Sequence, residues 1–163
     1  MASPVELRQD VMLAHFVASF EKLEDLRTHP STNPIAMTFA ISEPDEWGQI
    51  AWRPRRTETK AESLELLYAK LPARFPPLFE RLLLTFRWAE VDLKTYTLMA
   101  NPLGSDFQGF FAEISRDPGL WEGLLPAGYL RFAKGPDMDY DPVCFDMNSR
   151  KKSREMRVVK NQP

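Results

Sequence analysis

The residues best suited to chemistry are concentrated in Gly128–Met147, which contains Cys144, the single cysteine of the chain, and four aspartates. A thiol nucleophile requires a neighbouring base, and the chain has two histidines, His15 and His29. His15 lies inside a helical pattern, and His29 directly precedes a proline that ends this pattern. Cys144 lies between two apolar residues of an alternating strand pattern. We therefore expect a packed thiol rather than a nucleophile.

Three aspartates of this segment, Asp137, Asp139 and Asp141, are spaced like the start of an EF-hand calcium loop. The pattern then fails, because position 6 of the loop is a proline rather than a glycine and position 12 is an asparagine rather than a glutamate. Three interpretations stay open: a solvated turn, a contact surface for a protein partner, and a metal or small-molecule site. If the loop has a function, these aspartates and Tyr140 are better suited to contact a partner than to hold a metal ion.

Signatures of other catalytic and cofactor sites are absent from the sequence. It contains no GxSxG turn around a nucleophile, no glycine-rich phosphate loop and no HExxH or CxxC metal pattern. A hydrolase with scattered carboxylates remains an alternative, because acids that meet only in the folded chain leave no local motif. We expect a non-catalytic protein without a cofactor or a bound metal.

Charge is distributed in blocks, although the net charge is only −2. Residues 88–148 carry 10 acidic and 4 basic side chains, whereas residues 149–163 carry 6 basic and 1 acidic. The basic tail lacks aromatic residues on which bases could stack, so we expect no nucleic-acid binding. No apolar run approaches the length of a membrane span, and the first ten residues lack the features of a secretory signal. These patterns predict a cytoplasmic protein that does not bind membranes.

Trp47 is the tryptophan that we expect to be most exposed. It lies in the acidic segment EPDEWGQ between two predicted strands. A buried tryptophan usually belongs to the core, whereas an exposed one is typical of an interface anchor. We therefore add Trp47 to the candidate partner-binding residues.

Apolar periodicity predicts the elements that would position these residues. Helices are expected near residues 3–29, 59–71, 76–86, 105–114 and 117–125, and strands near 35–41, 50–52, 88–98, 129–132, 143–147 and 156–159. Capping boxes at Ser3 and Thr59 would begin the first two helices, and Met12 would belong to the buried stripe of the first. The separation of helices from strands predicts an α+β fold, with a mostly antiparallel sheet of about five to six strands flanked by helices. The length fits one domain over residues 1–163.

Residues 50–160 combine a tryptophan before a predicted capped helix, a Leu-Pro pair after it, an apolar helix and a predicted closing antiparallel meander. The residues that carry these features are Trp52, Leu71-Pro72, Phe79, Leu82, Leu83 and GYLRFAKGPDMDYDPVCFDMNSRKKSREMRVV. In the order and spacing of these features, residues 50–160 resemble the SUKH superfamily, and residues 1–49 would be an N-terminal extension with a helix and a strand.

This resemblance implies a six-stranded or similar sheet flanked by helices, with no enzyme centre. The family includes fungal cell-wall synthesis regulators and many bacterial immunity proteins, which are small cytosolic proteins that bind toxin effectors. For this chain the resemblance implies a protein-binding module, with a basic toxin effector as one candidate partner. Opposite charge on the two partners would favour rapid association. A small-molecule or metal-binding domain that uses residues 137–141 is the alternative.

Overall fold

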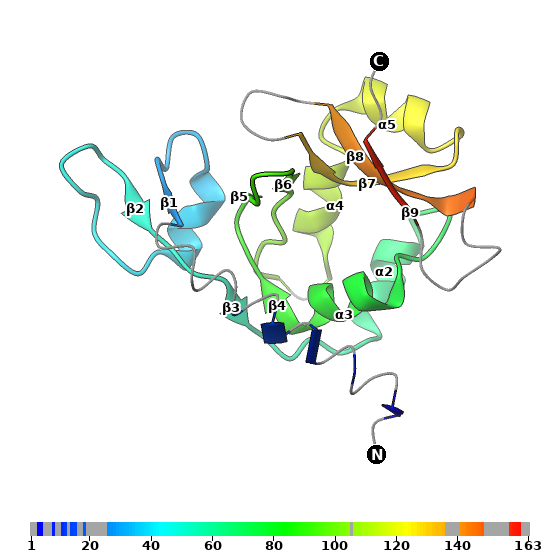
Figure 1. The fold of residues 1–163 in the computed structure, drawn as a ribbon, viewed down its shortest axis with the longest axis horizontal. Coiled ribbons are helices and arrows are strands. Elements are labelled where there is room, and N and C mark those ends of the chain that lie inside the picture. The colour runs from blue at the N-terminus through cyan, green and yellow to red at the C-terminus, as the bar shows by residue number, and fades with distance from the viewer. Residues whose placement is uncertain are drawn as a thin grey trace.

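The computed structural model describes residues 3, 4, 8, 11, 12, 14, 15, 18, 26–104, 106–135, 141–148 and 157–160. Its helices are the 3-10 helix η1 (Pro34–Phe39) and the α-helices α2 (Ser63–Tyr68), α3 (Pro77–Thr85), α4 (Gln108–Ile114) and α5 (Pro118–Leu124). Its strands are β1 (Arg27–Thr28), β2 (Ile50–Ala51), β3 (Arg55–Arg56), β4 (Phe86–Arg87), β5 (Val91–Asp92), β6 (Thr97–Leu98), β7 (Tyr129–Lys134), β8 (Pro142–Asp146) and β9 (Arg157–Lys160). Figure 1 shows β1, η1 and β2 in a lobe on one side, the β7–β9 strands with α5 on the other, and β5 and β6 between them.

The α+β class is confirmed, but the strands do not form one sheet. In the described part of the chain they form the pairs β1–β2 and β3–β4 and a sheet with the order β5-β6-β7-β8-β9, all antiparallel. The expectation of one sheet of about five to six strands is therefore wrong in its organisation. Pro54 contributes to the division, because it separates β2 from β3 and has no N–H for a ladder.

The closing meander β7-β8-β9 is confirmed, and it carries much of the core. Phe132 of β7 and Phe145 of β8 stack with their ring centroids 4.1 Å apart. Phe79 of α3 packs edge-on against both rings, at 5.4 and 5.3 Å. Phe75 lies 5.0 Å from Phe79 and joins the same cluster. These aromatic contacts fix α3 against the sheet.

The expected strand over residues 88–98 is instead a hairpin. The chain reverses between β5 and β6, where Lys94 has a φ of 71° and its N–H donates to Asp92 Oδ1 at 2.7 Å. An aspartate that accepts a hydrogen bond from the N–H two residues later favours a turn. This local turn outweighs the β-forming residues on either side of it.

The expected strand over residues 35–41 is also wrong, because η1 occupies most of it. Pro34 is the first helical residue, where its missing N–H is tolerated. Ala36 and Phe39 are buried, and their spacing of three matches the turn of a 3-10 helix. The side-chain amide of Asn33, the residue before η1, donates to the Glu90 carbonyl at 3.0 Å and ties the lobe to the β5 region.

The second helix begins later than its expected capping box, since α2 starts at Ser63 and Glu62 makes no side-chain capping bond. Thr59 instead accepts a hydrogen bond from the buried Arg87 side chain at 3.0 Å. The observed starts of α3 at Pro77 and of α5 at Pro118 agree with the positions expected from the sequence. The Asp117 side chain caps α5 by accepting the Leu120 N–H.

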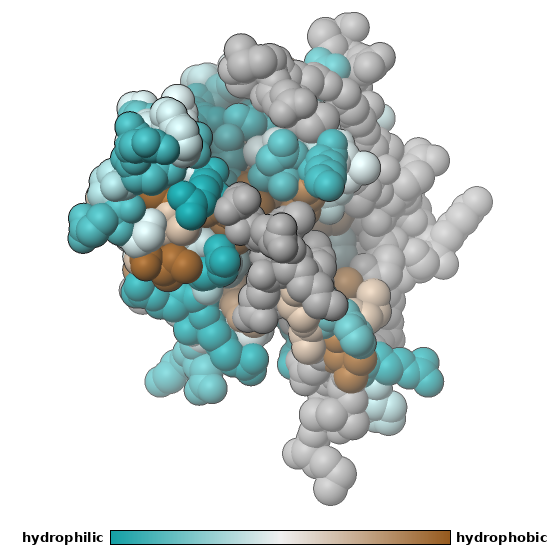
Figure 2. Space-filling model, turned by 60° about the vertical axis from the view of Figure 1, so that its left-hand side comes forward, coloured by the Kyte–Doolittle hydropathy of each residue, from teal (hydrophilic) through white to brown (hydrophobic). Residues whose placement is uncertain are grey.

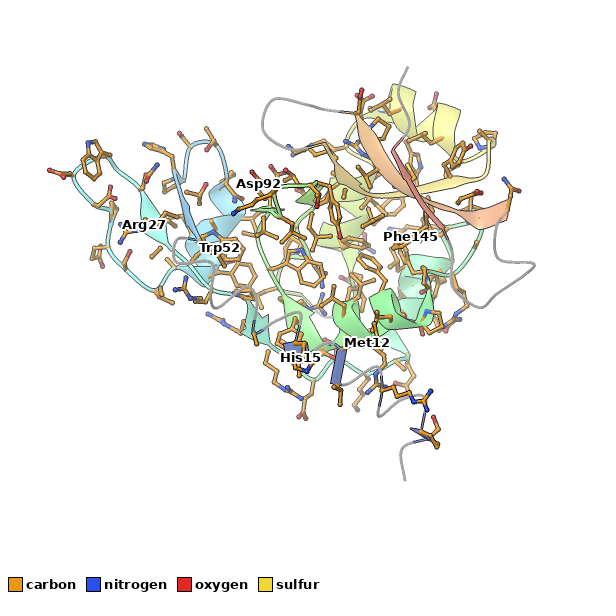
Figure 3. All side chains as sticks on the ribbon, viewed as in Figure 1. Met12, His15, Arg27, Trp52, Asp92 and Phe145 are labelled. Atoms are coloured by element: carbon orange, nitrogen blue, oxygen red, sulfur yellow. The ribbon has the colours of Figure 1, made fainter. Side chains whose placement is uncertain are left out.

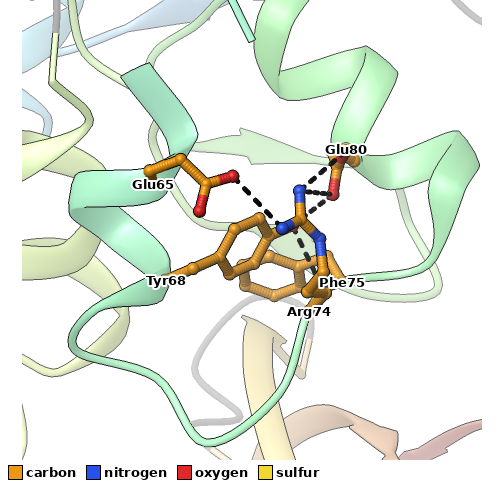
Figure 4. A network of polar contacts seen from close by, with 5 residues as sticks. All are labelled: Glu65, Tyr68, Arg74, Phe75 and Glu80. Carbon is orange, nitrogen blue, oxygen red and sulfur yellow. Dashed lines mark hydrogen bonds and ion pairs between the residues drawn. The ribbon is translucent and has the colours of Figure 1, made fainter. Parts of the chain in front are cut away.

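A polar network joins α2 to α3 across the turn between them (Figure 4). The Tyr68 hydroxyl donates to Glu80 Oε2 at 2.6 Å and accepts from the Phe75 N–H at 3.2 Å. Arg74 pairs with Glu65 at 3.2 Å and with Glu80 at 3.5 Å, and its guanidinium lies 4.3 Å from the Tyr68 ring centroid. Burial, and then the hydrogen bond to Glu80, raise the pKa of Tyr68 well above its ordinary value.

The N-terminal helix is described only at separate positions, and those between residues 4 and 18 are helical. Met12 was expected on the buried stripe of this helix but is 56% exposed. Phe16, Phe20 and Leu23 of that stripe lie outside the described residues. Among the helices that are described, none has the length and apolar character needed to cross a membrane.

Candidate functional site

The structure describes two of the five candidate partner-binding residues. Asp137, Asp139 and Tyr140 lie outside the described residues. Asp141 precedes β8, and its main-chain carbonyl accepts the Gly135 N–H at 2.9 Å. Trp47 lies in the loop after η1, in the lobe that Figure 1 shows on the opposite side from β8. The two described candidates therefore belong to separate parts of the fold.

Trp47 is the most exposed of the large apolar side chains that the structure describes, at 72%. Residues 41–49 form its loop, which we call the Trp47 loop. Asp45 organises this loop, because its Oδ1 accepts the N–H groups of Trp47 at 3.0 Å and Gln49 at 2.8 Å. The Asp45 N–H donates to the Gln49 carbonyl, and the Gly48 N–H donates to the Asp45 carbonyl. The loop backbone is thus fixed while the indole is left in solvent.

Asp45 also connects the Trp47 loop to β1, since its Oδ2 accepts a hydrogen bond from Arg27 at 3.1 Å. The hydrogen bond from the Gln49 N–H, helped by the Trp47 N–H and by the Arg27 charge, holds the pKa of Asp45 below its ordinary value. The turn needs a left-handed residue, and Gly48 provides it with a φ of 77°. The sequence Asp-x-Trp-Gly was the local signal for this turn, but the Arg27 contact spans 18 residues and left no such signal.

Two more apolar side chains of the same lobe are exposed. Met37 of η1 is 51% exposed, and Ile41 at the start of the Trp47 loop is 60% exposed. Figure 2 brings this lobe forward and shows hydrophobic groups set among hydrophilic ones. Glu43 and Glu46 are exposed in the Trp47 loop and contribute negative charge to it. The lobe therefore offers apolar contact points within an acidic surface.

A cleft of about 280 Å³ lies between this lobe and the β5–β6 hairpin. Leu26, Trp52 and Val91 supply its apolar lining, and the remaining lining residues are polar or charged: Arg27, Thr28, Thr32, Asn33, Glu90, Asp92 and Thr97. Figure 3 shows Asp92 on the hairpin, Arg27 on β1 and Trp52 directly after β2. Sequence reasoning missed this cleft, because its walls come from segments that are far apart in the sequence, residues 26–33 with Trp52 on one side and residues 90–97 on the other.

Cys144 is a packed thiol, as expected. It is fully buried in β8, beside its register partner Arg131. Burial raises the pKa of Cys144 to about 12, and the charge of Arg131 offsets only part of this effect. The thiol is therefore protonated and inaccessible near neutral pH, which is the opposite of what a nucleophile requires.

His29 lies at the surface and contacts a serine. Its Nδ1 is 2.7 Å from the Ser31 hydroxyl and accepts the Ser31 N–H at 3.2 Å. A hydrolytic triad would need a carboxylate on the other ring nitrogen. His29 Nε2 instead faces Gly48, and no described carboxylate bonds to it. The pair therefore stabilises the turn after β1.

Within the described ranges, no group of three or more His, Cys, Asp or Glu side chains is placed to hold a metal ion. Comparison with known proteins adds no relative: no family model matches the chain, no curated protein matches it, and no solved structure matches it.

Proposed function

We propose that this protein is a non-catalytic protein-binding module and that Trp47 anchors its partner. The observation that carries the proposal is an indole that is 72% exposed on a loop whose backbone is held by Asp45. An exposed tryptophan loses water-accessible apolar surface when a partner covers it, and tryptophan is enriched among interface hot spots. A loop that is already ordered loses little conformational entropy on binding.

The charge around Trp47 indicates the chemistry of the partner. Glu43 and Glu46 precede Trp47 in the same loop and are exposed, whereas Asp45 is paired with Arg27. A partner with an apolar pocket and a basic rim would be complementary to this surface. This agrees with the SUKH-type resemblance and with the hypothesis that the chain is an immunity protein for a basic toxin effector. Asp137, Asp139, Tyr140 and Asp141 remain proposed as a second contact surface, separate from the lobe, because Asp141 lies directly before β8.

We further propose that residues 1–163 form one cytoplasmic domain with a SUKH-like region over residues 50–160. A continuous buried cluster that extends from Leu26 to Phe145 supports the single domain, because it includes residues of the lobe and of the meander. The lone thiol, which is buried and unpaired, is consistent with a reducing compartment.

The test is affinity capture of the partner from the native lysate, followed by binding measurements with that purified partner. Trp47→Ala should weaken binding by at least about tenfold, as expected for a hot-spot residue. Asp45→Ala keeps the indole but removes the hydrogen bonds that order the loop, so it should also weaken binding.

Leu66→Ala is the matched control, because Leu66 is 55% exposed on α2 and lies outside the lobe. It should bind as tightly as the wild type. Equal affinity of the wild type and Trp47→Ala would refute the anchor role of Trp47. A captured partner that is acidic throughout would refute the proposed charge complementarity.

A further inference from the structure

One face of the β5–β6 hairpin is polar, and it forms a wall of the cleft. Asp92 is the register partner of Thr97, and Thr97 is the register partner of Lys134 on β7. Cross-strand partners point to the same side of a sheet, and Glu90 shares that side because it lies two residues before Asp92. The neighbouring positions Leu98 and Ala133 point to the other side and belong to the core.

The charges around the cleft are balanced except at Asp92. Glu90 pairs with Lys134 at 2.9 Å, and Arg27 pairs with Asp45 at 3.1 Å. Asp92 Oδ1 accepts the Lys94 N–H, but its carboxylate has no ion-pair partner in the part of the chain that the structure describes. Asp92 is exposed, so it places one negative charge without an ion pair at the solvent-open edge of the cleft.

Thr97 is a second polar group without a partner in the cleft. Its residue is 5% exposed, and it lines the cavity. Its hydroxyl makes no hydrogen bond with any residue that the structure describes, and it is open to the cleft rather than fully enclosed, because Arg131 Nε is the fully buried unbonded atom among the described side chains. A hydroxyl in this position is satisfied when a molecule with a hydrogen-bonding group enters the cleft.

We propose that the cleft binds a small organic cation, a free ammonium or guanidinium compound no larger than an amino acid. Asp92 supplies the opposite charge through a charge-assisted hydrogen bond, and the Thr97 hydroxyl accepts a second hydrogen bond from the same ligand. The volume of about 280 Å³ limits the ligand to this size. The inference goes beyond the protein-binding role and does not depend on it, because Trp47 does not line the cleft.

The test is titration of the ¹⁵N-labelled full chain with agmatine, followed by amide chemical shifts and calorimetry. Saturable shifts are expected at the amides of Thr28, Asp92 and Thr97. Asp92→Asn should weaken agmatine binding by about tenfold, since it removes the charge and keeps the shape. Thr97→Val, which replaces the hydroxyl by a methyl group of similar size, should weaken it by about threefold.

Two further compounds identify the source of the cation. Capped arginine, with an acetyl group and a methylamide, represents a side chain of a protein partner, and capped citrulline is its neutral match. Tighter binding of agmatine than of capped arginine supports a free compound, whereas the reverse order overturns that assignment. Binding of capped citrulline that equals that of capped arginine would show that charge is not recognised, and this overturns the proposal.

Glu122→Gln is the control for Asp92→Asn, because it neutralises an exposed carboxylate outside the cleft. It should bind agmatine like the wild type, and so should Trp47→Ala even if the partner-binding proposal fails. A well-dispersed spectrum of each variant confirms that it is folded. Absence of saturable shifts in the wild type at about 10 mM agmatine, or unchanged affinity in Asp92→Asn, would overturn the proposal.

Discussion

Arg87 shows how much a single residue determines in this protein. It is 1% exposed, and burial lowers the pKa of its guanidinium to about 10. The side chain donates to Asn101 Oδ1 at 3.0 Å and to the Thr59 hydroxyl at 3.0 Å, and it lies 4.1 Å from the Phe107 ring centroid. One side chain therefore joins β4 to the segment before α2, to the segment after β6 and to the residue that precedes α4.

Replacement of Arg87 by methionine should lower the free energy of unfolding by about 2 kcal/mol. The buried Asn101 acceptor and the half-buried Thr59 acceptor lose their donor, which outweighs relief of the buried charge. Denaturant unfolding measures the change. Arg87→Lys should also be destabilised, because an ammonium group cannot reach both acceptors.

Arg56→Met is the control for this prediction, since Arg56 is exposed on β3. Its stability should stay within about 0.5 kcal/mol of the wild type. If Arg87→Met were as stable as the wild type, the hydrogen bonds of Arg87 would make no net contribution to the free energy of unfolding.

The short elements of this protein depend on polar side chains at their ends. The Trp47 loop is ordered by Asp45, the β5–β6 turn by Asp92, and the start of α5 by Asp117. The α2–α3 corner is joined by the Tyr68 hydroxyl, which bonds to both Glu80 and the Phe75 N–H. Elements of six to nine residues have few internal hydrogen bonds, so these contacts hold them in place.

Tyr68→Phe should destabilise the protein by about 1 to 2 kcal/mol. The change removes only the hydroxyl, so Glu80 loses a donor and the Phe75 N–H loses an acceptor. Thermal unfolding or denaturant unfolding gives the magnitude.

Tyr129→Phe is the matched control, because Tyr129 is half-buried at the start of β7 and its hydroxyl makes no hydrogen bond with the described residues. It should leave stability nearly unchanged. Similar losses in both variants would contradict a specific role for the Tyr68 network.

At the scale of the whole molecule, one aromatic and aliphatic core connects the lobe to the meander. Phe39 and Ile50 of the lobe, Leu83 of α3 and Phe145 of β8 belong to the same buried cluster. Trp47 and the proposed cation cleft lie on the lobe side, whereas Cys144 is enclosed on the meander side. Burial of this thiol makes the stability of the whole fold dependent on pH.

The protein should lose stability as the pH rises above 9. The ordinary pKa of the Cys144 thiol is 9.0 and the folded value is about 12, so the unfolded chain loses this proton first. Its contribution to stability is complete below pH 9 and declines as the pH rises toward 12. The expected loss is about 1 kcal/mol between pH 8 and pH 10.

Comparison with Cys144→Ala isolates this effect, because other alkaline groups act equally in both proteins. The free energy difference between the two should change with pH over this range. Parallel pH profiles would show that the thiol has an ordinary pKa in the folded state.

The sequence by itself determined the elements whose signals are local. Pro77 and the Asp117-Pro118 pair specified the starts of α3 and α5, and alternating residues specified β7, β8 and β9. The exposure of Trp47 also followed from its acidic loop, and the burial of Cys144 from its strand pattern. Each of these features depends on residues that are neighbours in the chain.

Only the tertiary structure decided the features that depend on contacts between distant segments. Asn33 and Glu90 are 57 residues apart, yet their hydrogen bond joins the two walls of the cleft. The Thr59 side chain matched a capping box but bonds to Arg87 instead, because a buried guanidinium needs acceptors more than a helix end needs a cap. The cleft also depends on contacts between distant segments, because it forms only where the lobe packs beside the hairpin that carries Asp92.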